Sequence, residues 1–318
     1  MQRPFRFGVL CEEMGTREAW FAKVRRVEEL GYDTLLLRDH FMPGPFDDQF
    51  APLSALMAAA MVSNTLRIGT MVFDNDYRHP VVLGKEVATL DLLSGGRFEF
   101  GLGAGWMGSE YEQAGMAFDP PGTRIERFEE ALRIFKGLFA DGPLTFSGKH
   151  YTIRDIDGFP KPLQRPHPPI LIGAGGRRML TLAAREANII GIMAGPLNAG
   201  APSVNDPAAY TAESMAQKIA WIREAAGERF SRIELSVITT PLFTSNRSRG
   251  ARQVAQTRGW SNVSVEEILQ MPTIFIGTVE QVAEQMLERR ERFGISYYMT
   301  LDRMMDAYAP LVERLSSE

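Results

Sequence analysis

The chain has 318 residues, of which 45% are hydrophobic and 23% are charged. This composition is typical of a globular protein and excludes a disordered, collagen-like or disulfide-scaffold chain. The 35 basic and 39 acidic residues give a formal net charge of -4, which argues against binding to nucleic acid or to an anionic membrane.

Short apolar runs alternate with longer segments of helical periodicity, a pattern typical of βα units around a parallel sheet. The apolar runs predict about eight strands, at residues 5–10, 34–37, 66–72, 97–102, 169–172, 188–192, 233–239 and 297–301. The second run does not alternate with polar residues, so both of its faces are expected to be buried. Each run except the last is followed by helical sequence. This repeat predicts an α/β barrel.

Capping residues and glycines mark the ends of the predicted helices. Thr16 is placed to cap a helix that ends at Gly31. Pro80 fits the first turn of a helix that runs to Leu93. Capping boxes are predicted for Thr123 with Glu126 and for Thr278 with Gln281.

Two stretches exceed the simple repeat: residues 104–168 after the fourth strand and residues 241–275 after the seventh. The first contains a predicted hairpin around Ser147 and Gly148. Both stretches follow the carboxyl ends of strands, where the active sites of barrels lie. We therefore predict that these insertions wall or cover a site.

A glycine-rich turn after the fifth predicted strand is the best candidate for an anion site. It consists of Gly173, Ala174, Gly175 and Gly176. A turn of this kind that opens a helix directs free backbone N–H groups and the positive end of the helix dipole at a phosphate. Arg177 or Arg178 would add positive charge. The alternative is a tight strand-to-helix turn whose arginines lie in water.

Residues 103–108 match the G-x-G-x-x-G pattern of dinucleotide-binding folds and follow a strand. In such folds a helix continues from the third glycine of the first strand's turn. Here Gly115 and Pro120 interrupt the segment, and the pattern follows the fourth strand. These residues are therefore interpreted as glycines of a barrel rim, and nicotinamide binding through them is not expected.

Asp39 and His40 follow the second predicted strand, and a histidine near its ordinary pKa exchanges protons at neutral pH. The alternative is a hydrogen-bonded pair with a structural role. The histidines lack H-x-H or H-E-x-x-H spacing, and Cys11 is the only cysteine, so no metal site is predicted. The longest apolar run, residues 53–62, is shorter than the ~20 residues that span a bilayer. Without a signal peptide pattern at the start, we expect a cytoplasmic protein.

Several motifs together resemble one family. They are Gly31-Tyr32-Asp33 with Asp39-His40-Phe41, Leu66-Arg67-Ile68-Gly69-Thr70, Tyr77-Arg78-His79-Pro80, the runs 90–97 and 101–106, and Ile276-Gly277-Thr278 followed by the helix to Phe293-Gly294-Ile295. Across nearly the whole chain, the sequence resembles the luciferase-like flavin and deazaflavin oxidoreductases, specifically the branch dependent on coenzyme F420.

The resemblance implies a single luciferase-like domain over residues 1–318, built as a (β/α)8 TIM barrel with insertions after strands 4 and 7. A flavin-like ring would bind at the carboxyl-terminal mouth. The cofactor-binding residues implied are Asp39, Thr70, Met71, Asn75, Gly103, Ala104, Gly105, Trp106, Gly173, Ala174, Gly175 and Gly176. Relatives often have a non-proline cis peptide bond where this chain has Met71 and Val72, and we predict one here.

Deazaflavin relatives that act on sugar phosphates use a histidine matching His40 and a glutamate where this chain has Trp106. We therefore do not expect this chain to oxidise a sugar phosphate, and Glu110 is the nearest substitute for the glutamate. The catalytic residues predicted are His40 and Glu110, with Trp106 and Phe73 as walls of the substrate pocket.

The function expected from the resemblance is hydride transfer between coenzyme F420 and an unidentified small organic substrate. An FMN-dependent monooxygenase of the same fold is the first alternative, and a non-catalytic flavin-binding protein is the second. A nicotinamide dehydrogenase ranks third. By analogy with relatives, we expect a homodimer whose ligands are small molecules, without nucleic acid or membrane partners.

Overall fold

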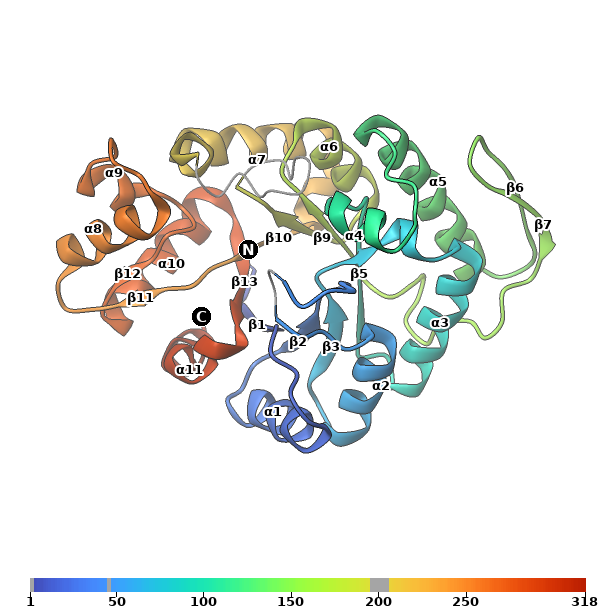
Figure 1. The fold of residues 1–318 in the computed structure, drawn as a ribbon, viewed down its shortest axis with the longest axis horizontal. Helices are drawn as coiled ribbons and strands as arrows, with labels where there is room; N and C mark the ends of the chain where they lie inside the picture. Colours follow the sequence, from blue (N-terminus) through green and yellow to red (C-terminus); the bar gives the residue numbers. More distant parts are fainter. Residues whose placement is uncertain (1–2, 45–46, 195–205) are drawn as a thin grey trace.

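The computed structural model describes residues 3–44, 47–194 and 206–318, and its parallel strands close into a barrel (Figure 1). The barrel strands are β1 (Arg6–Cys11), β2 (Thr34–Leu37), β3 (Arg67–Thr70), β5 (Phe98–Gly103), β8 (Ile170–Ala174), β9 (Ile189–Ile192), β10 (Glu234–Ile238) and β13 (Ile295–Leu301). Their order is β3-β2-β1-β13-β10-β9-β8-β5, and β3 pairs with β5 to close the ring. The predicted TIM barrel is confirmed.

Helices cover the outside of the barrel (Figure 1). They are α1 (Arg17–Glu29), α2 (Pro52–Val62), α3 (Pro80–Leu93), α5 (Pro121–Phe139), α6 (Arg177–Glu186), α7 (Ala212–Ala226), α10 (Val279–Phe293) and α11 (Met305–Leu315). The expectation that no helix follows the last strand was wrong, because α11 buries Tyr308, Leu311 and Val312. Pro310 lies inside this helix. Because proline is unfavourable in a helix interior, it argues against a helix in the sequence.

The helix caps follow the predictions with one exception. The Thr16 side chain accepts from the N–H of Ala19, and Thr278 forms the predicted capping box with Gln281. The capping box predicted at Thr123 was wrong. Helix α5 begins two residues earlier, at Pro121, and has no side-chain cap. The fixed φ of proline suits the first helical position, so the helix starts there and Thr123 lies within its first turn.

Both predicted insertions are present; in Figure 1 the second lies at the left, whereas the hairpin of the first lies at the right. The first contains α4 (Gly108–Gln113), α5 and the antiparallel hairpin of β6 (Leu144–Ser147) and β7 (Thr152–Ile156). The second contains β11 (Leu242–Phe243), α8 (Arg247–Arg258), α9 (Val265–Gln270) and β12 (Ile276–Gly277). The remaining short elements are β4 (Phe73–Asp74), η1 (Asn75–Tyr77), η2 (Pro207–Tyr210), η3 (Gly227–Arg232) and η4 (Asp302–Met304).

The inside of the barrel has an apolar layer contributed by strand residues. Its buried members are Leu10, Leu36, Met71, Leu171, Ile189, Tyr297, Met299 and Leu301. A larger apolar core lies between the strands and the surrounding helices. Among the helices of the described residues, none has the length and apolar character required to cross a membrane. The peptide bond between Met71 and Val72 is cis, as predicted.

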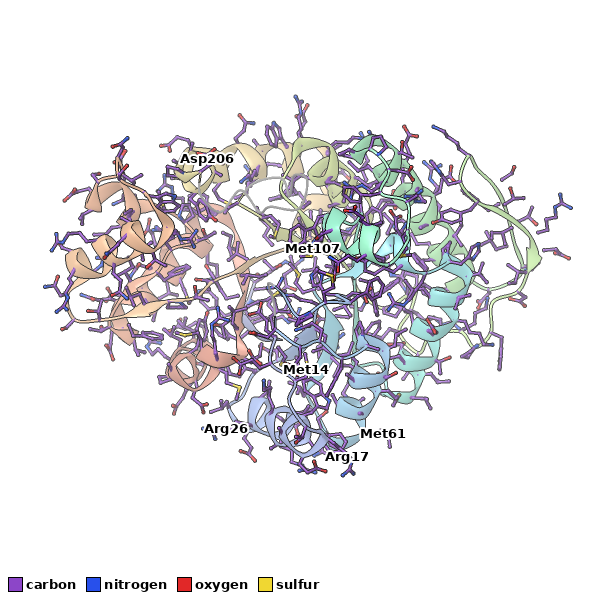
Figure 2. All side chains as sticks on the ribbon, in the orientation of Figure 1. Met14, Arg17, Arg26, Met61, Met107 and Asp206 are labelled. Atoms are coloured by element: carbon purple, nitrogen blue, oxygen red, sulfur yellow. The ribbon has the colours of Figure 1, made fainter. Side chains whose placement is uncertain are left out.

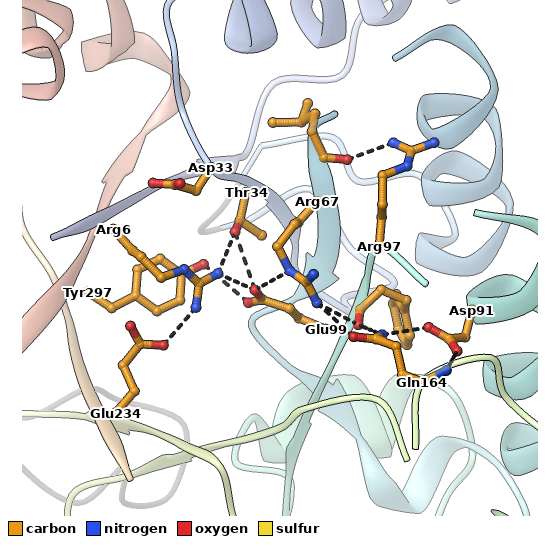
Figure 3. Close-up of polar contacts among 12 residues, drawn as sticks. Arg6, Asp33, Thr34, Arg67, Asp91, Arg97, Glu99, Gln164, Glu234 and Tyr297 are labelled. Atoms are coloured by element: carbon orange, nitrogen blue, oxygen red, sulfur yellow. Dashed lines mark hydrogen bonds and ion pairs between the residues drawn. The ribbon is translucent and has the colours of Figure 1, made fainter. Parts of the chain in front are cut away.

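A cluster of charged side chains closes the amino-terminal end of the barrel (Figure 3). Glu99 is almost fully buried and accepts hydrogen bonds from Arg6 and Arg67. Arg6 also pairs with Glu234, at 2.7 Å. Since these four residues stand at the starts of β1, β3, β5 and β10, the cluster fills the end opposite to the strands' carboxyl ends.

Candidate active site at the barrel mouth

A cavity of about 380 Å³ opens at the carboxyl ends of the barrel strands. Its size falls within the range typical of small-molecule sites. Met107, one of its lining residues, lies near the centre of the molecule in Figure 2, whereas Met61 of α2 lies at the periphery. The lining comes from β2, β3, β4, β5, β8, β9 and β10 or the turns that follow them, from η1, and from α4, α5 and α6.

The structure brings nearly all the predicted site residues together around this cavity. Those that line it are Asp39, His40, Met71, Gly103, Ala104, Gly105, Trp106, Glu110, Gly173, Ala174, Gly175 and Gly176. Thr70 and Asn75 do not line it. The Thr70 hydroxyl donates to the carbonyl of Gly101 at 2.8 Å, and Asn75 is buried below the surface of the cavity.

The insertions contribute unequally to the cavity. The first provides Met107, Glu110, Arg124 and Ile125, so it walls the site as predicted. No residue of the second insertion, 241–275, is among the residues that line the cavity. The second insertion instead packs in a small apolar cluster that includes Trp260 and is shared with Tyr210 of η2. The prediction that it walls this site was therefore wrong.

His40 and Glu110 form a buried pair on one side of the cavity. Nδ1 of His40 lies 2.8 Å from Oε2 of Glu110. The same carboxylate accepts hydrogen bonds from the N–H groups of Phe41 and Met42 and from the hydroxyl of Tyr77. These contacts fix the carboxylate and, through it, the orientation of the imidazole ring. Helix α4 therefore supplies a partner for a histidine that follows β2.

Asp39 is held by Arg78 through two hydrogen bonds, of 2.5 and 3.0 Å. It also accepts from the backbone N–H of Asp74, at 3.1 Å. Bidentate pairing with a guanidinium is a strong and directional interaction. These contacts tie the loop after β2 to residues 74–78 and hold Asp39 at the cavity wall.

Two further carboxylates, those of Asp74 and Asp76, lie beside Asp39. Asp76 is paired with Arg127 of α5, at 2.8 and 2.7 Å. Asp74 lines the cavity, and both its oxygens lie 2.8 Å from the hydroxyl of Tyr111. Burial raises the pKa of Asp74 to about 7, with a contribution from the nearby carboxylates of Asp76 and Asp39. Hydrogen bonds from the N–H of Asp76 and from Tyr111 oppose this rise.

The glycine turn after β5 fits closely against this group. Gly105 has φ +73°, in the left-handed region that favours glycine. A Cβ at this position would lie 2.7 Å from Oδ2 of Asp74 and would overlap the Tyr111 hydroxyl. Arg124 of α5 donates to the carbonyls of Ala104 and Gly105, which holds the turn in place. The first insertion thus supports the glycine turn from outside.

The turn after β8 has the properties expected of an anion site. Gly176 is the N-cap of α6 and offers no side chain to the first-turn N–H groups. Residues 173–179 all line the cavity, so the amino-terminal end of α6 borders it. Arg177 and Arg178 are also in the lining, with Glu224 at 4.0 Å and Glu126 at 3.8 Å respectively. These residues fit a phosphate group of a flavin-like cofactor.

Apolar and aromatic side chains form the rest of the wall. The ring of Trp106 stands perpendicular to that of His40, with the centroids 6.0 Å apart. Phe73 also lines the cavity, as predicted, together with Val72, Met179, Met193 and Ile238. Flat rings and flexible thioethers suit a planar organic ligand.

Sequence reasoning missed three contributors to the site. Arg124 lies in α5, and no local pattern indicates that it reaches the glycine turn. Arg38 lines the cavity and donates to Glu12 at 2.7 Å, a contact between two strand ends that only the closed barrel reveals. Asp74 lies just after the third predicted strand, where polar side chains are expected at the barrel mouth, and that position was the available signal.

Comparisons with known proteins support the same interpretation as the geometry of the site. A family model described as luciferase-like monooxygenase matches residues 16–297. The chain is 33% identical over 192 residues to an F420-dependent glucose-6-phosphate dehydrogenase of Microbacterium testaceum, a match covering 59% of this chain and 56% of that protein. The chain thus spans little more than half the length of this relative. It is 25% identical over 302 residues to an FMNH(2)-dependent dimethylsulfone monooxygenase of Pseudomonas putida, covering 88% of this chain and 83% of that protein.

Solved structures share the fold along almost the whole chain. An F420-dependent secondary alcohol dehydrogenase in complex with an F420-acetone adduct matches with a TM-score of 0.74 at 17% identity, covering 98% of each chain. The EDTA monooxygenase of Chelativorans sp. BNC1 matches with a TM-score of 0.75 at 15% identity, covering 98% of this chain and 94% of that one. At these identities the likeness establishes the barrel and its closure. The family match over residues 16–297 shows that this chain belongs to the luciferase-like monooxygenase family of oxidoreductases.

Proposed function

We propose that the protein transfers a hydride between coenzyme F420 and a small organic substrate. One observation carries the proposal: an acid/base pair, His40 with Glu110, and two glycine turns border a single cavity. The turn at Gly173 to Gly176 suits a phosphate, and the turn at Gly103 to Gly105 borders the same cavity. The names of the dehydrogenase relatives support the deazaflavin as the cofactor.

When bound, the deazaflavin supplies or accepts the hydride. The chain's own residues hold and move the proton that accompanies it. Glu110 accepts at Nδ1 of His40 and so favours the tautomer with its proton on that atom. Proton exchange with the substrate then falls to Nε2. Trp106 and Phe73 restrict the substrate to one side of the cavity and exclude water.

The cofactor is tested by titrating the purified protein with coenzyme F420 and, separately, with FMN. Preferential binding of F420 is expected, followed by F420 reduction or oxidation with members of a panel of alcohols, enones and imines. Tight binding of F420 without turnover of any panel member would favour the non-catalytic flavin-binding alternative. Turnover with a reduced nicotinamide and no flavin would overturn the proposal.

Replacement of His40 by Ala tests the role of the histidine. Loss of a general acid/base group lowers turnover by about 10²–10⁴-fold. The affinity for F420 should change far less, because the phosphate and ring are held elsewhere. Steady-state kinetics and a fluorescence titration separate the two quantities. Unchanged turnover would remove His40 from the mechanism.

A reduced-FMN monooxygenase is the second candidate function. It is favoured by the extent of one match, since the dimethylsulfone monooxygenase aligns over 88% of this chain. In that case FMN would occupy the same cavity, and its phosphate would use the same turn. Oxygen consumption that depends on reduced FMN and on an added substrate would distinguish this activity from hydride transfer.

We also propose that the protein forms a homodimer through the outer faces of α2 and α3. Large apolar side chains are exposed there: Met61 at 71% and Leu93 at 60%, with Val82 and Leu92 beside them. Helix α2 has no charged residue, which is unusual for a surface helix. Sedimentation velocity over a concentration series tests the assembly.

A further inference from the structure

Three carboxylates lie together below the glycine turn, and only two have cationic partners. Arg78 pairs with Asp39, and Arg127 pairs with Asp76. Within residues 3–44, 47–194 and 206–318, no lysine, arginine or histidine side chain makes an ion pair with Asp74. The third negative charge would thus be buried beside two others with no ion pair of its own, offset only by the longer-range charge of Arg78, which Asp39 already pairs, a situation that favours the protonated form.

The titratable and charged groups around Asp74 come from every neighbouring element. They are Asp39 after β2, Asp76 and Tyr77 in η1, Arg78 after η1, Glu110 and Tyr111 in α4, and Arg127 in α5. Asp39 and Asp76 disfavour a charge on Asp74, while the two arginines are already engaged by those carboxylates. Glu110 is occupied by His40 and Tyr77.

The hydrogen bonds of Asp74 indicate which of its oxygens holds the proton. Oδ1 accepts from the backbone N–H of Asp76 at 2.9 Å and lies 2.8 Å from the Tyr111 hydroxyl. Oδ2 also lies 2.8 Å from Tyr111 but has no backbone donor. Because Tyr111 has a single proton, it cannot donate to both oxygens at once. A proton on Oδ2 satisfies this geometry.

Oδ2 is also the oxygen nearest to the glycine turn of the cavity. It would lie 2.7 Å from a Cβ at Gly105, so the absence of a side chain there lets Asp74 and the Tyr111 hydroxyl approach the turn. Asp74 lines the cavity although it is only 7% exposed. A proton on Oδ2 can turn to Tyr111 when no ligand offers an acceptor. It can turn to the cavity when a ligand does.

We infer that Asp74 acts as a neutral carboxylic acid that donates a hydrogen bond from Oδ2 to a carbonyl or ring acceptor of the bound ligand, and so selects ligands with an acceptor at this point. The identity of the ligand rests on the proposed function, in which it is the deazaflavin or its substrate. Ionised Asp74 offers no such donor and places an extra negative charge against the acceptor. The same ligand therefore binds more weakly to the ionised form.

The first arm of the test needs no cofactor. Infrared difference spectra of the ligand-free protein between pH 5.5 and pH 9 should contain a carboxylic acid carbonyl band that titrates near neutral pH and is absent from Asp74→Asn. Tyr111→Phe removes a hydrogen bond to the ionised form and should raise the midpoint. Asp76→Asn removes a neighbouring negative charge and should lower it. The control Asp141→Asn changes an aspartate whose side chain is 91% exposed, and it should keep the band.

The second arm measures the affinity for F420 and for FMN across the same pH range. The wild-type affinity should fall at least tenfold relative to that of Asp74→Asn as pH rises through neutrality. Ionisation of the ligand's own phosphate cancels in this ratio. A wild-type infrared midpoint near pH 4 overturns the inference, as does a pH dependence of binding shared by wild type and Asp74→Asn. If neither cofactor binds, the proposed function fails, and the infrared arm alone decides the protonation of Asp74.

Discussion

The two ends of the barrel both bury charged side chains, but they balance charge differently. At the amino-terminal end, Arg6 and Arg67 face Glu99 and Glu234, so every charge of the cluster has an opposite partner (Figure 3). At the mouth, Asp74 remains without a cation among the residues described above. The first arrangement closes the barrel, and the second leaves a group that can change its protonation state beside a cavity. Asp91 is also fully buried and is hydrogen-bonded to the neutral Gln164 away from the cavity, so the position of Asp74 beside the cavity, and not its unpaired charge alone, makes it a candidate functional group.

The largest effect on stability is expected at the closed end. Glu99→Ala removes the carboxylate that accepts from Arg67 and from Arg6. Breaking a buried ion pair lowers the free energy of unfolding by about 3–5 kcal/mol. Urea unfolding measures this loss. Glu129→Gln removes an exposed partner of Arg133 and should cost less than about 1 kcal/mol. Equal losses in the two variants would contradict the distinction between buried and exposed pairs.

A pH-dependent effect is expected at the mouth. Asp74 has a pKa of about 7 in the folded protein, whereas an aspartate in an unfolded chain has a pKa of about 4. Between these values unfolding releases a proton, so stability falls as pH rises and levels off above the folded pKa. The free energy of unfolding of the wild type should decrease by at most roughly 4 kcal/mol relative to Asp74→Asn over that range. Parallel curves for the two proteins would show that Asp74 is ionised throughout.

A smaller effect is expected from Glu110→Gln. The amide can place an N–H group against Nδ1 of His40, which disturbs the tautomer that the carboxylate holds. Turnover should fall by about 10- to 100-fold, with little change in KM. The pH profile of kcat should shift as well, which a purely structural role would not produce. Glu112→Gln, on an exposed position of the same helix, is the matched control.

The smallest effect is expected on the surface. Leu93→Glu places a charge on the outer face of α3 and should weaken self-association by about tenfold, without changing turnover per folded subunit. Arg17→Glu introduces the same residue on α1, where the side chain is 75% exposed, and should leave association unchanged. Sedimentation at several concentrations compares the two variants. A monomeric wild type would remove the proposed interface.

The barrel was predictable because its signals are local. Uninterrupted apolar runs gave strands at their observed positions, and Thr16 and Thr278 marked helix starts through side chains that act within three residues. The chain of contacts that shapes the site is not local. Arg124 reaches Gly105 from 19 residues away, and Glu110 meets His40 across 70 residues. Such groups come together only in the folded chain, so no periodic pattern in the sequence predicts their pairing.

The two insertions contribute differently to the cavity, and this difference matters for protein engineering and for the divergence of substrate preference. Residues 241–275 do not line the cavity and pack in an apolar cluster shared with Tyr210 and Ile276, so substitutions at their exposed positions are expected to leave the cavity wall unchanged. Residues 104–125 form part of the wall and support the glycine turn, so a change of substrate preference in this scaffold must be sought mainly among them.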